Sequence, residues 1–324
     1  MTKKKLRIVY MGTPDFAVLP LKKIIEDGFD VVGVVTNPDK PAGRGQKLRE
    51  SPVKLFARKV GLRILQPEKF KDAKFIEELR SIRADLQLVV AFKMLPEIIW
   101  DMPPLGTVNL HASLLPDYRG AAPINWAVIN GEKYSGVSTF LLKNEIDTGN
   151  LIYQDKVAIS DDMSAGELHD ELMVKGSDLL VRTVKAIENG NYPLFSQDKL
   201  LEGREAIHAP KIFKKDMKIN WDLGLDKVFN HIRGLSPFPG AWTEFEKLSD
   251  GQVISVKIFK TQKIYEFHNF EVGSFLSDEK NNLDIYLHDG KIRIEQLQLS
   301  GKKRMSVEDF LRGFKIADYK LKLL

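Results

Sequence analysis

The sequence contains no cysteine among its 324 residues. Disulfide bonds, thiolate metal sites and a cysteine nucleophile are therefore excluded. No apolar run approaches the roughly 18 residues that a membrane-spanning helix needs, and the apolar stretch near the start is too short for a signal peptide. We therefore expect a cytoplasmic protein that makes no membrane contact.

Metal-binding patterns are missing as well, because the six histidines are scattered without the spacing of a ligand set. The composition is that of an ordinary globular protein, with 43% apolar and 29% charged residues. The net charge is +5, and residues 208–324 hold 20 Lys and Arg against 16 Asp and Glu, which is most of that excess. A basic excess gathered in one part of the chain favours a contact with nucleic acid.

Strand-like and helix-like segments alternate in the first part of the chain. Strands are expected at 6–12, 30–36, 62–65, 86–92, 106–111 and 137–143, and helices at 14–27, 51–60, 72–82 and 164–187. This alternation is typical of right-handed βαβ units around a mostly parallel sheet, so we expect an α/β fold. In such sheets the binding site lies beyond the carboxyl ends of the strands.

The pattern changes after the last of these helices. Residues 190–207 contain two glycines and a proline without a clear period and are interpreted as a linker. Beyond them come short strand-like runs that are bounded by Asp-Gly turns. The chain is therefore expected to hold a catalytic domain at 1–189 and a smaller β-rich domain with a barrel-like sheet at 208–324.

Three polar residues stand where chemistry is expected in such a fold. Asn109 and His111 lie two apart on the strand at 106–111, so their side chains point to the same face. Taken alone, an Asn-x-His pair is more often structural than catalytic. Asp147 follows the next strand in an Asp-Thr-Gly turn, where a solvated aspartate is the ordinary case. Two neighbouring strand ends would bring Asp147 beside His111.

These residue types suit the transfer of an acyl group to an amine. Asn109 can donate its amide hydrogen to the oxyanion of a tetrahedral intermediate. His111 can donate or relay a proton near neutral pH. Asp147 can orient His111, favour its charged form, or bind a water that carries the amine proton. Because the amine attacks directly, no protein nucleophile is needed.

The segment 36–51 is the least regular part of the first domain. It has no apolar period and holds two prolines, two glycines and the basic residues Lys40, Arg44, Lys47 and Arg49. Long loops without secondary structure are uncommon in compact domains and are often functional, although a plain solvated loop is the alternative. Basic groups at the carboxyl edge of a sheet can neutralise phosphates.

Several runs of the sequence resemble the methionyl-tRNA formyltransferase family. They are N-L-H-A-S-L-L-P at 109–116, R-G-A-A-P-I at 119–124, D-T-G at 147–149, and the segments 232–241 and 301–313. The likeness extends over nearly the whole chain. It implies a Rossmann-like domain followed by a C-terminal barrel that resembles an OB fold.

The resemblance also implies roles for the site residues. The catalytic trio would be Asn109, His111 and Asp147. The pocket for 10-formyltetrahydrofolate, the formyl donor and co-substrate, would be lined by the loop that follows the strand, namely by Ser113, Leu114, Leu115 and Pro116. The basic residues of 36–51 would contact the acceptor, initiator methionyl-tRNA, in translation initiation. We expect a monomer that needs no metal.

The sequence departs from the family in two places. Residues 91–96, A-F-K-M-L-P, stand where the family often has A-Y-G-x-I-L-P, and they are one residue shorter. The folate contacts of this segment therefore stay open. Residues 144–146, which lead into Asp147, also differ from the commoner pattern, and neither departure touches the trio.

Other functions share parts of this pattern. Relatives with the same trio formylate a purine-pathway ribonucleotide or a sugar amine, or hydrolyse the folate, but the basic segment and the basic C-terminal domain favour tRNA. A tRNA-binding module without catalysis is disfavoured by the intact trio. A nucleotide-dependent oxidoreductase is disfavoured because the glycine turn after the first strand lacks the G-x-G-x-x-G spacing.

Overall fold

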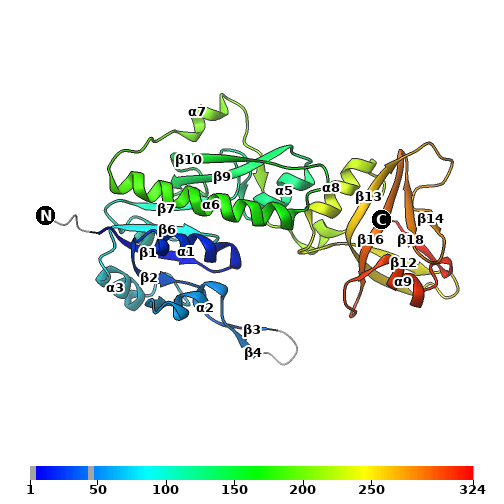
Figure 1. Cartoon of the computed structure of the whole chain (residues 1–324), viewed down its shortest axis with the longest axis horizontal. Helices are drawn as coiled ribbons and strands as arrows, with labels where there is room; N and C mark the ends of the chain where they lie inside the picture. Colours follow the sequence, from blue (N-terminus) through cyan, green and yellow to red (C-terminus); the bar gives the residue numbers. More distant parts are fainter. Residues whose placement is uncertain (1–4, 43–46, 324) are drawn as a thin grey trace. The chain divides into compact units, whose positions relative to one another are not determined.

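The structure is a computed structural model that describes residues 5–42 and 47–323 (Figure 1). Contacts divide the chain into two compact units. The first consists of Met1–Ala121, Ser135–Val157 and His169–Ala209, and the second of Ala122–Tyr134, Ala158–Leu168 and Pro210–Leu324. Two short internal segments are therefore part of the second unit although they come early in the sequence.

A seven-stranded sheet forms the centre of the first unit, with the strand order β10-β9-β7-β6-β1-β2-β5. The strands are β1 (Arg7–Gly12), β2 (Asp30–Val35), β5 (Ile64–Leu65), β6 (Leu86–Val90), β7 (Thr107–His111), β9 (Tyr134–Leu141) and β10 (Leu151–Ala158). All pairs from β5 to β7 are parallel, and β9 runs antiparallel to β7. The expected Rossmann-like, mostly parallel sheet is confirmed.

Helices cover both faces of this sheet. They are η1 (Asp15–Ala17), α1 (Val18–Glu26), α2 (Pro52–Lys59), α3 (Ala73–Ser81), α4 (Glu97–Trp100) and α6 (Ala165–Glu188). Helices α3 and α4 place Phe75 and Ile99 in one buried cluster with Val9 and Met11 of β1. Helices α1 and α6 lie side by side (Figure 1), and Lys185 Nζ of α6 is 2.7 Å from the carboxylate of Asp27, which caps α1.

The starts of two helices follow directly from the sequence. Ser51 accepts a hydrogen bond from the Lys54 N–H at 3.1 Å, and Pro52 occupies the first turn of α2. Asp72 accepts the Lys74 N–H at 2.8 Å at the start of α3. Side-chain caps of this kind satisfy N–H groups that have no partner inside the helix, which explains why both boundaries were predictable.

The segment 36–51 is not devoid of secondary structure, and this expectation was wrong. Short strands β3 (Lys40–Ala42) and β4 (Lys47–Arg49) pair antiparallel, with Lys40 opposite Arg49. Asp39, the residue before β3, accepts hydrogen bonds from Lys54 Nζ at 2.5 Å and from Gln66 Nε2 at 2.9 Å. These contacts join residues far apart in sequence, so no local sequence pattern predicts them.

Residues 190–207, interpreted from the sequence as a linker, belong to the first compact unit. They contain α7 (Gln197–Leu201), and Phe195 forms an isolated antiparallel bridge with Leu151 of β10. The guanidinium of Arg204 donates to both carboxylate oxygens of Asp117, at 2.8 and 2.6 Å. The compact units therefore do not coincide with the boundaries expected from the sequence, 1–189, 190–207 and 208–324. That these boundaries limit independently folding domains stays a prediction.

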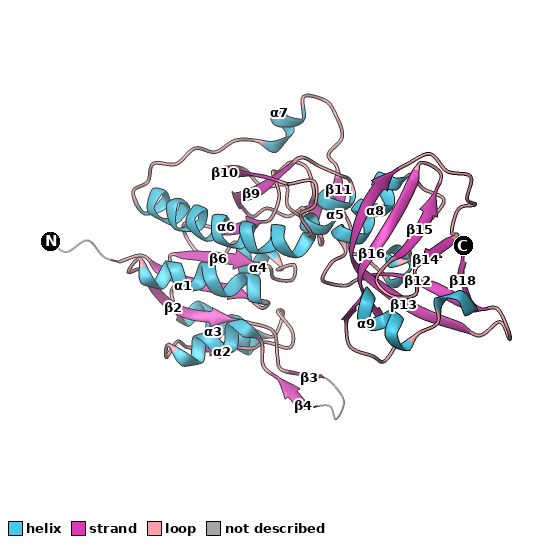
Figure 2. Cartoon of the chain, turned by 45° about the vertical axis from the view of Figure 1, so that its right-hand side comes forward, coloured by secondary structure: helices cyan, strands magenta, loops and turns pink. Residues whose placement is uncertain are grey.

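The second unit is built on an antiparallel sheet with the order β14-β15-β16-β13-β12-β18, and β17 pairs with β16. The strands are β12 (Ala241–Lys247), β13 (Val253–Tyr265), β14 (Phe275–Ser277), β15 (Leu283–Leu287), β16 (Gly290–Leu299), β17 (Met305–Ser306) and β18 (Tyr319–Lys322). The sheet curls into a barrel-like form (Figure 2). The β-rich barrel expected from the sequence is thus confirmed.

Helices close the core of the second unit. They are α5 (Pro123–Ile129), η2 (Lys214–Met217), α8 (Leu225–Gly234), α9 (Val307–Gly313) and η3 (Ile316–Asp318). Trp221, Ile232, Phe245 and Phe310 lie in one buried cluster with the inner residues of the sheet. Of the helices in residues 5–42 and 47–323, none combines the length and the apolar character needed to cross a membrane.

Candidate functional site

The site is organised by the end of β7. Leu110 faces α6, because a Cβ added to Gly176 of that helix would lie 3.0 Å from a Leu110 methyl group. Side chains alternate along a strand, so Asn109 and His111 both point to the opposite face, as predicted. Asn109 is half-buried, and His111 is 6% exposed.

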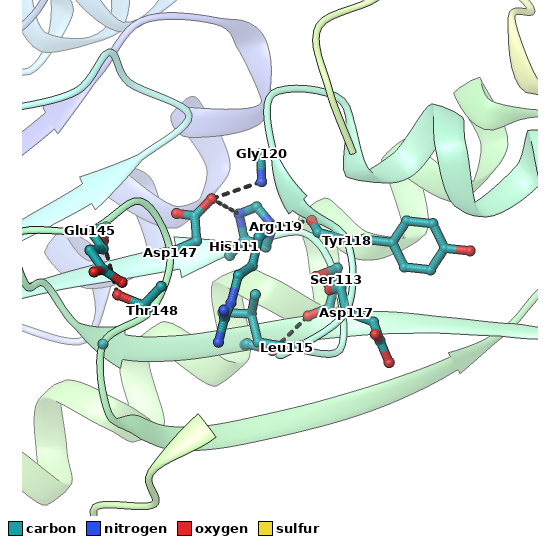
Figure 3. A network of polar contacts seen from close by, with 12 residues as sticks. His111, Ser113, Leu115, Asp117, Tyr118, Arg119, Gly120, Glu145, Asp147 and Thr148 are labelled. Atoms are coloured by element: carbon teal, nitrogen blue, oxygen red, sulfur yellow. Dashed lines mark hydrogen bonds and ion pairs between the residues drawn. The ribbon is translucent and has the colours of Figure 1, made fainter. Parts of the chain in front are cut away.

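The two ring nitrogens of His111 have different surroundings (Figure 3). Nε2 lies 2.8 Å from the main-chain carbonyl oxygen of Tyr118, and Nδ1 lies 3.8 Å from the Asp147 Oδ2 atom. A carbonyl oxygen can only accept a hydrogen bond, so Nε2 carries a hydrogen in this arrangement. The nitrogen that gains or loses a proton is then Nδ1, on the side of the Asp147 carboxylate.

The Asp147 carboxylate is fixed from a second direction. Its Oδ2 atom accepts the Gly120 N–H at 3.0 Å (Figure 3), and its main chain has a φ of 55°, in the left-handed region. Gly120 belongs to the short strand β8 (Arg119–Gly120), which pairs in parallel with β11 (His208–Ala209). A Cβ at Gly120 would lie 2.5 Å from the Ala209 carbonyl oxygen, so this approach requires glycine.

Asp147 thus lies beside His111, but the expected reason was incomplete. Strand β9 runs antiparallel to β7, with Ser138 opposite His111 and Leu141 opposite Val108. The carboxyl end of β9 therefore points away from the carboxyl end of β7. The chain after β9 must turn back to bring Asp147 to His111, which a parallel arrangement of the two strand ends would not need.

The loop after β7 is tied inward by its own polar groups. Ser113 donates its hydroxyl hydrogen to the Asp117 carbonyl at 2.7 Å. The Ser138 hydroxyl donates to the Ser113 carbonyl at 2.6 Å and accepts the Leu115 N–H at 3.1 Å. Gln154 Nε2 donates to the Leu115 carbonyl at 2.8 Å. Ser138 and Gln154 were missed from the sequence, because neither lies in a recognisable motif.

The four residues expected to line a folate pocket have unequal exposure. Ser113, Leu115 and Pro116 are buried, and Leu114 is half-buried. The side chains of Ser113 and Leu115 already serve the core, since they are 0% and 2% exposed. Their role in folate binding stays a prediction, and a ligand at this loop would meet its main chain and Leu114 rather than these two side chains.

A buried amide connects the Asp147 turn with β8. Gln197, the first residue of α7, is 1% exposed. Its Nε2 donates to the carbonyl oxygens of Asp147 and Gly149, both at 2.8 Å. Its Oε1 accepts from the Arg119 guanidinium, at 3.0 Å from Nε and 2.8 Å from Nη2. Sequence reasoning missed Gln197 because it placed this residue in a linker.

The basic residues of 36–51 lie on β3, on β4 and between them. Lys40 and Arg49 are exposed and occupy opposite positions of the strand pair. Lys47 begins β4, and Arg44 lies outside the described residues. Within the part of the chain that the structure describes, no group of three or more His, Asp or Glu side chains could hold a metal ion.

Comparison with known proteins relates both parts of the chain to formyltransferases. Residues 4–184 match the family model described as Formyl transferase, and residues 211–315 match the model of the Formyl transferase C-terminal domain. A methionyl-tRNA formyltransferase of Bacteroides thetaiotaomicron is 51% identical over 322 residues, which cover 99% of this chain and 100% of that protein. One of Phocaeicola vulgatus is 55% identical over 320 residues, 98% of each chain.

Solved structures share the fold at lower identity. WlaRD, described as a sugar 3N-formyl transferase in the presence of dTDP and 5-N-formyl-THF, has a TM-score of 0.66 at 23% identity, covering 92% of this chain and 99% of its own. HypX from Aquifex aeolicus in complex with tetrahydrofolic acid has a TM-score of 0.63 at 17% identity, covering 98% of this chain and 51% of its own. By its family models and its full-length relatives, the chain belongs to the methionyl-tRNA formyltransferase family of enzymes.

Proposed function

We propose that this enzyme transfers a formyl group from 10-formyltetrahydrofolate to the amino group of methionine on initiator methionyl-tRNA, in the cytoplasm and at the start of translation. The observation that carries this proposal is the likeness over 98–99% of the chain to relatives of that name at 51% and 55% identity. The close approach of His111 to Asp147 supports it from the side of the chemistry.

The reaction is an acyl transfer between two nitrogens. The methionine amine attacks the formyl carbon, and the carbonyl oxygen becomes an oxyanion. The bond from that carbon to N10 of the folate then breaks, the amine loses a proton and N10 gains one. We assign oxyanion stabilisation to Asn109, whose half-buried side chain stands on the same face of β7 as His111.

His111 and Asp147 share the proton-handling role in this proposal. The Tyr118 carbonyl holds Nε2, so the proton that moves is the one at Nδ1. Nδ1 is 3.8 Å from Asp147 Oδ2, which is too long for a direct hydrogen bond and short enough for a strong charge interaction. Asp147 therefore stabilises positive charge on the ring, or shares a bridging water with it.

Substrate binding is assigned to two further regions. The loop that contains Ser113, Leu114, Leu115 and Pro116 is proposed to hold the folate, mainly through its main chain and Leu114. The exposed Lys40 and Arg49 are proposed to contact tRNA phosphates together with Arg44 and Lys47. No metal takes part in the proposed reaction.

The test is formyl transfer from labelled 10-formyltetrahydrofolate onto charged initiator tRNA. Parallel reactions contain uncharged tRNA, free methionine or an amino-sugar nucleotide as the acceptor. Transfer to charged initiator tRNA alone supports the proposal. Transfer to the amino sugar, or release of formate without an acceptor, would instead assign the site to a sugar formyltransferase or to a folate hydrolase.

A further inference from the structure

The buried amide of Gln197 joins the two chain segments that surround the Asp147 carboxylate. These segments are the turn at 147–149 and the strand β8. On one side it holds the carbonyl oxygens of Asp147 and Gly149. On the other side it holds Arg119, the neighbour in sequence of Gly120, whose N–H binds the Asp147 carboxylate. All of these residues lie in the first compact unit.

The chemistry of these partners fixes how the amide is oriented. A guanidinium can only donate hydrogen bonds, and main-chain carbonyl oxygens can only accept them. The Gln197 oxygen must therefore face Arg119, and its nitrogen must face the turn at Asp147. Both hydrogens of Nε2 and both acceptor positions of Oε1 are used. A carboxylate of the same size could keep the Arg119 contact but would repel the two carbonyl oxygens.

Asp147 is a residue whose main chain needs such support. Its φ of 55° lies in a region that residues with a Cβ seldom adopt. The direction of its side chain depends on that main-chain conformation. The distance of 3.8 Å to His111 Nδ1 therefore depends on the peptide that Gln197 holds.

Attachment of α7 to the first unit does not itself require this amide. Phe195 pairs with Leu151, and Arg204 binds Asp117 through two hydrogen bonds. These contacts flank α7 on both sides. The Gln197 side chain is thus free to serve the geometry of the site rather than the anchoring of the segment.

We propose that Gln197 is a positioning residue that holds the Asp147 carboxylate at the Nδ1 side of His111, an inference that rests on the proposed function. It contacts no reacting atom in this role. Its effect passes through Asp147, so its loss lowers the rate of formyl transfer while substrate binding is kept.

The experiment is a double-mutant cycle with Gln197→Glu, Asp147→Asn and the double variant. Gln197→Glu removes both donors to the Asp147 turn with little change of size. We expect its kcat to fall roughly tenfold, and by no more than about 100-fold, because misplacement of a group by about 1 Å has effects of this size. The KM values for the folate and for charged tRNA should stay within about twofold of the wild type.

The double variant separates a positioning role from a general one. If Gln197 acts through Asp147, the double variant has the kcat of Asp147→Asn alone, because residues that act as a unit are not additive. Losses that multiply, or a Gln197→Glu variant with normal kcat, would overturn the inference. Full activity of Asp147→Asn would instead remove Asp147 from the proposed mechanism, and the role of Gln197 with it.

Two further variants guard against effects on folding. Leu200→Ala changes a 45% exposed residue on the same helix and should keep normal kcat. If Gln197→Glu does not fold, as judged by its thermal unfolding, Gln197→Asn takes its place in the cycle. That variant keeps a neutral amide that is too short to reach both sides, and the same non-additivity with Asp147→Asn decides the question.

Discussion

The loop of residues 112–120 and the strand pair β3–β4 use polar groups in opposite ways. In the loop, hydroxyl, amide and main-chain groups bind one another, and Ser113 is fully buried. In the strand pair, Lys40 and Arg49 are exposed at opposite positions. Chemistry on a small group needs fixed geometry, whereas attraction of a polyanion needs accessible charge. The difference suits the proposed reaction site beside the loop and the proposed nucleic-acid contact on the strand pair.

The largest effect is expected from removal of the proposed reacting groups at the end of β7, directly before this loop. We expect His111→Ala and Asn109→Ala each to lower kcat on the order of 100-fold or more, since each removes a proton carrier or an oxyanion donor. Thermal unfolding should show both variants folded. Near-normal kcat in either variant would take that residue out of the mechanism.

The next effect concerns the charge of Asp147, whose carboxylate lies between Gly120 of the loop and His111. Asp147→Asn keeps an oxygen for the Gly120 N–H but removes the negative charge beside His111. We expect kcat to fall by about 100-fold or less, because positive charge that develops on the ring loses its countercharge. The kcat is measured with saturating substrates, beside that of the wild type. Full activity of the variant would make Asp147 an ordinary turn residue.

A third variant tests whether the loop is as rigid as its contacts indicate. Ser138→Ala removes a buried hydroxyl that binds Ser113 and Leu115. We expect the free energy of unfolding to fall by about 1–3 kcal/mol, since buried polar groups are left without their partners. The matched control is Ser81→Ala, an exposed serine, which should change it by less than about 0.5 kcal/mol. Equal effects of both variants would contradict the view of a rigid loop.

The strand pair should respond in affinity rather than in stability. We expect Lys40→Ala and Arg49→Ala each to weaken binding of charged initiator tRNA and to flatten the log–log dependence on salt by roughly 0.7–0.9 for each phosphate that is no longer neutralised. Folate binding should not change. Lys71→Ala, at another exposed lysine, is the control. If the double variant binds tRNA with the wild-type slope, the strand pair is an ordinary surface feature.

The smallest effect is expected at the base of the strand pair. Hydrogen bonds from Lys54 and then Gln66 lower the pKa of Asp39 below its usual value. The charged Asp39 carboxylate therefore stabilises the start of the β3–β4 strand pair at neutral pH. This contribution disappears as the pH falls below about 4 and through the lowered pKa. Protection of the main-chain amides of Asp39, Lys40 and Ala42 from hydrogen exchange should fall in that range. Asp39→Asn should show lower protection already at neutral pH, without the acid dependence.

The sequence predicted those parts of the molecule that depend on hydrophobic periodicity and on helix caps. The alternation of buried strands with helices predicted the parallel sheet, and Ser51 and Asp72 marked two helix starts. The spacing of Asn109 and His111 predicted their shared face. In each case the cause is local, because pleat, helical period and cap act over a few neighbouring residues.

The parts that sequence reasoning missed depend on contacts between distant residues. The reversal of β9 was not predicted, since a buried strand has the same composition in either direction. Gln197 meets Asp147 across 50 positions of the chain and meets Arg119 across 78. Asp39 is likewise held by residues of α2 and of the chain after β5. A single polar residue in an irregular segment gives no sign of a partner so far away.

The tight packing at Gly120 should make this position intolerant of substitution. Its φ is 124°, and any side chain there would press on the Ala209 carbonyl oxygen from 2.5 Å. In a saturation-mutagenesis survey, every replacement at this position should therefore be depleted, as at a reacting group. The glycine supplies only an N–H to Asp147. Ranking positions by intolerance would place it beside His111, and only kinetic analysis of folded variants would tell steric exclusion from chemistry.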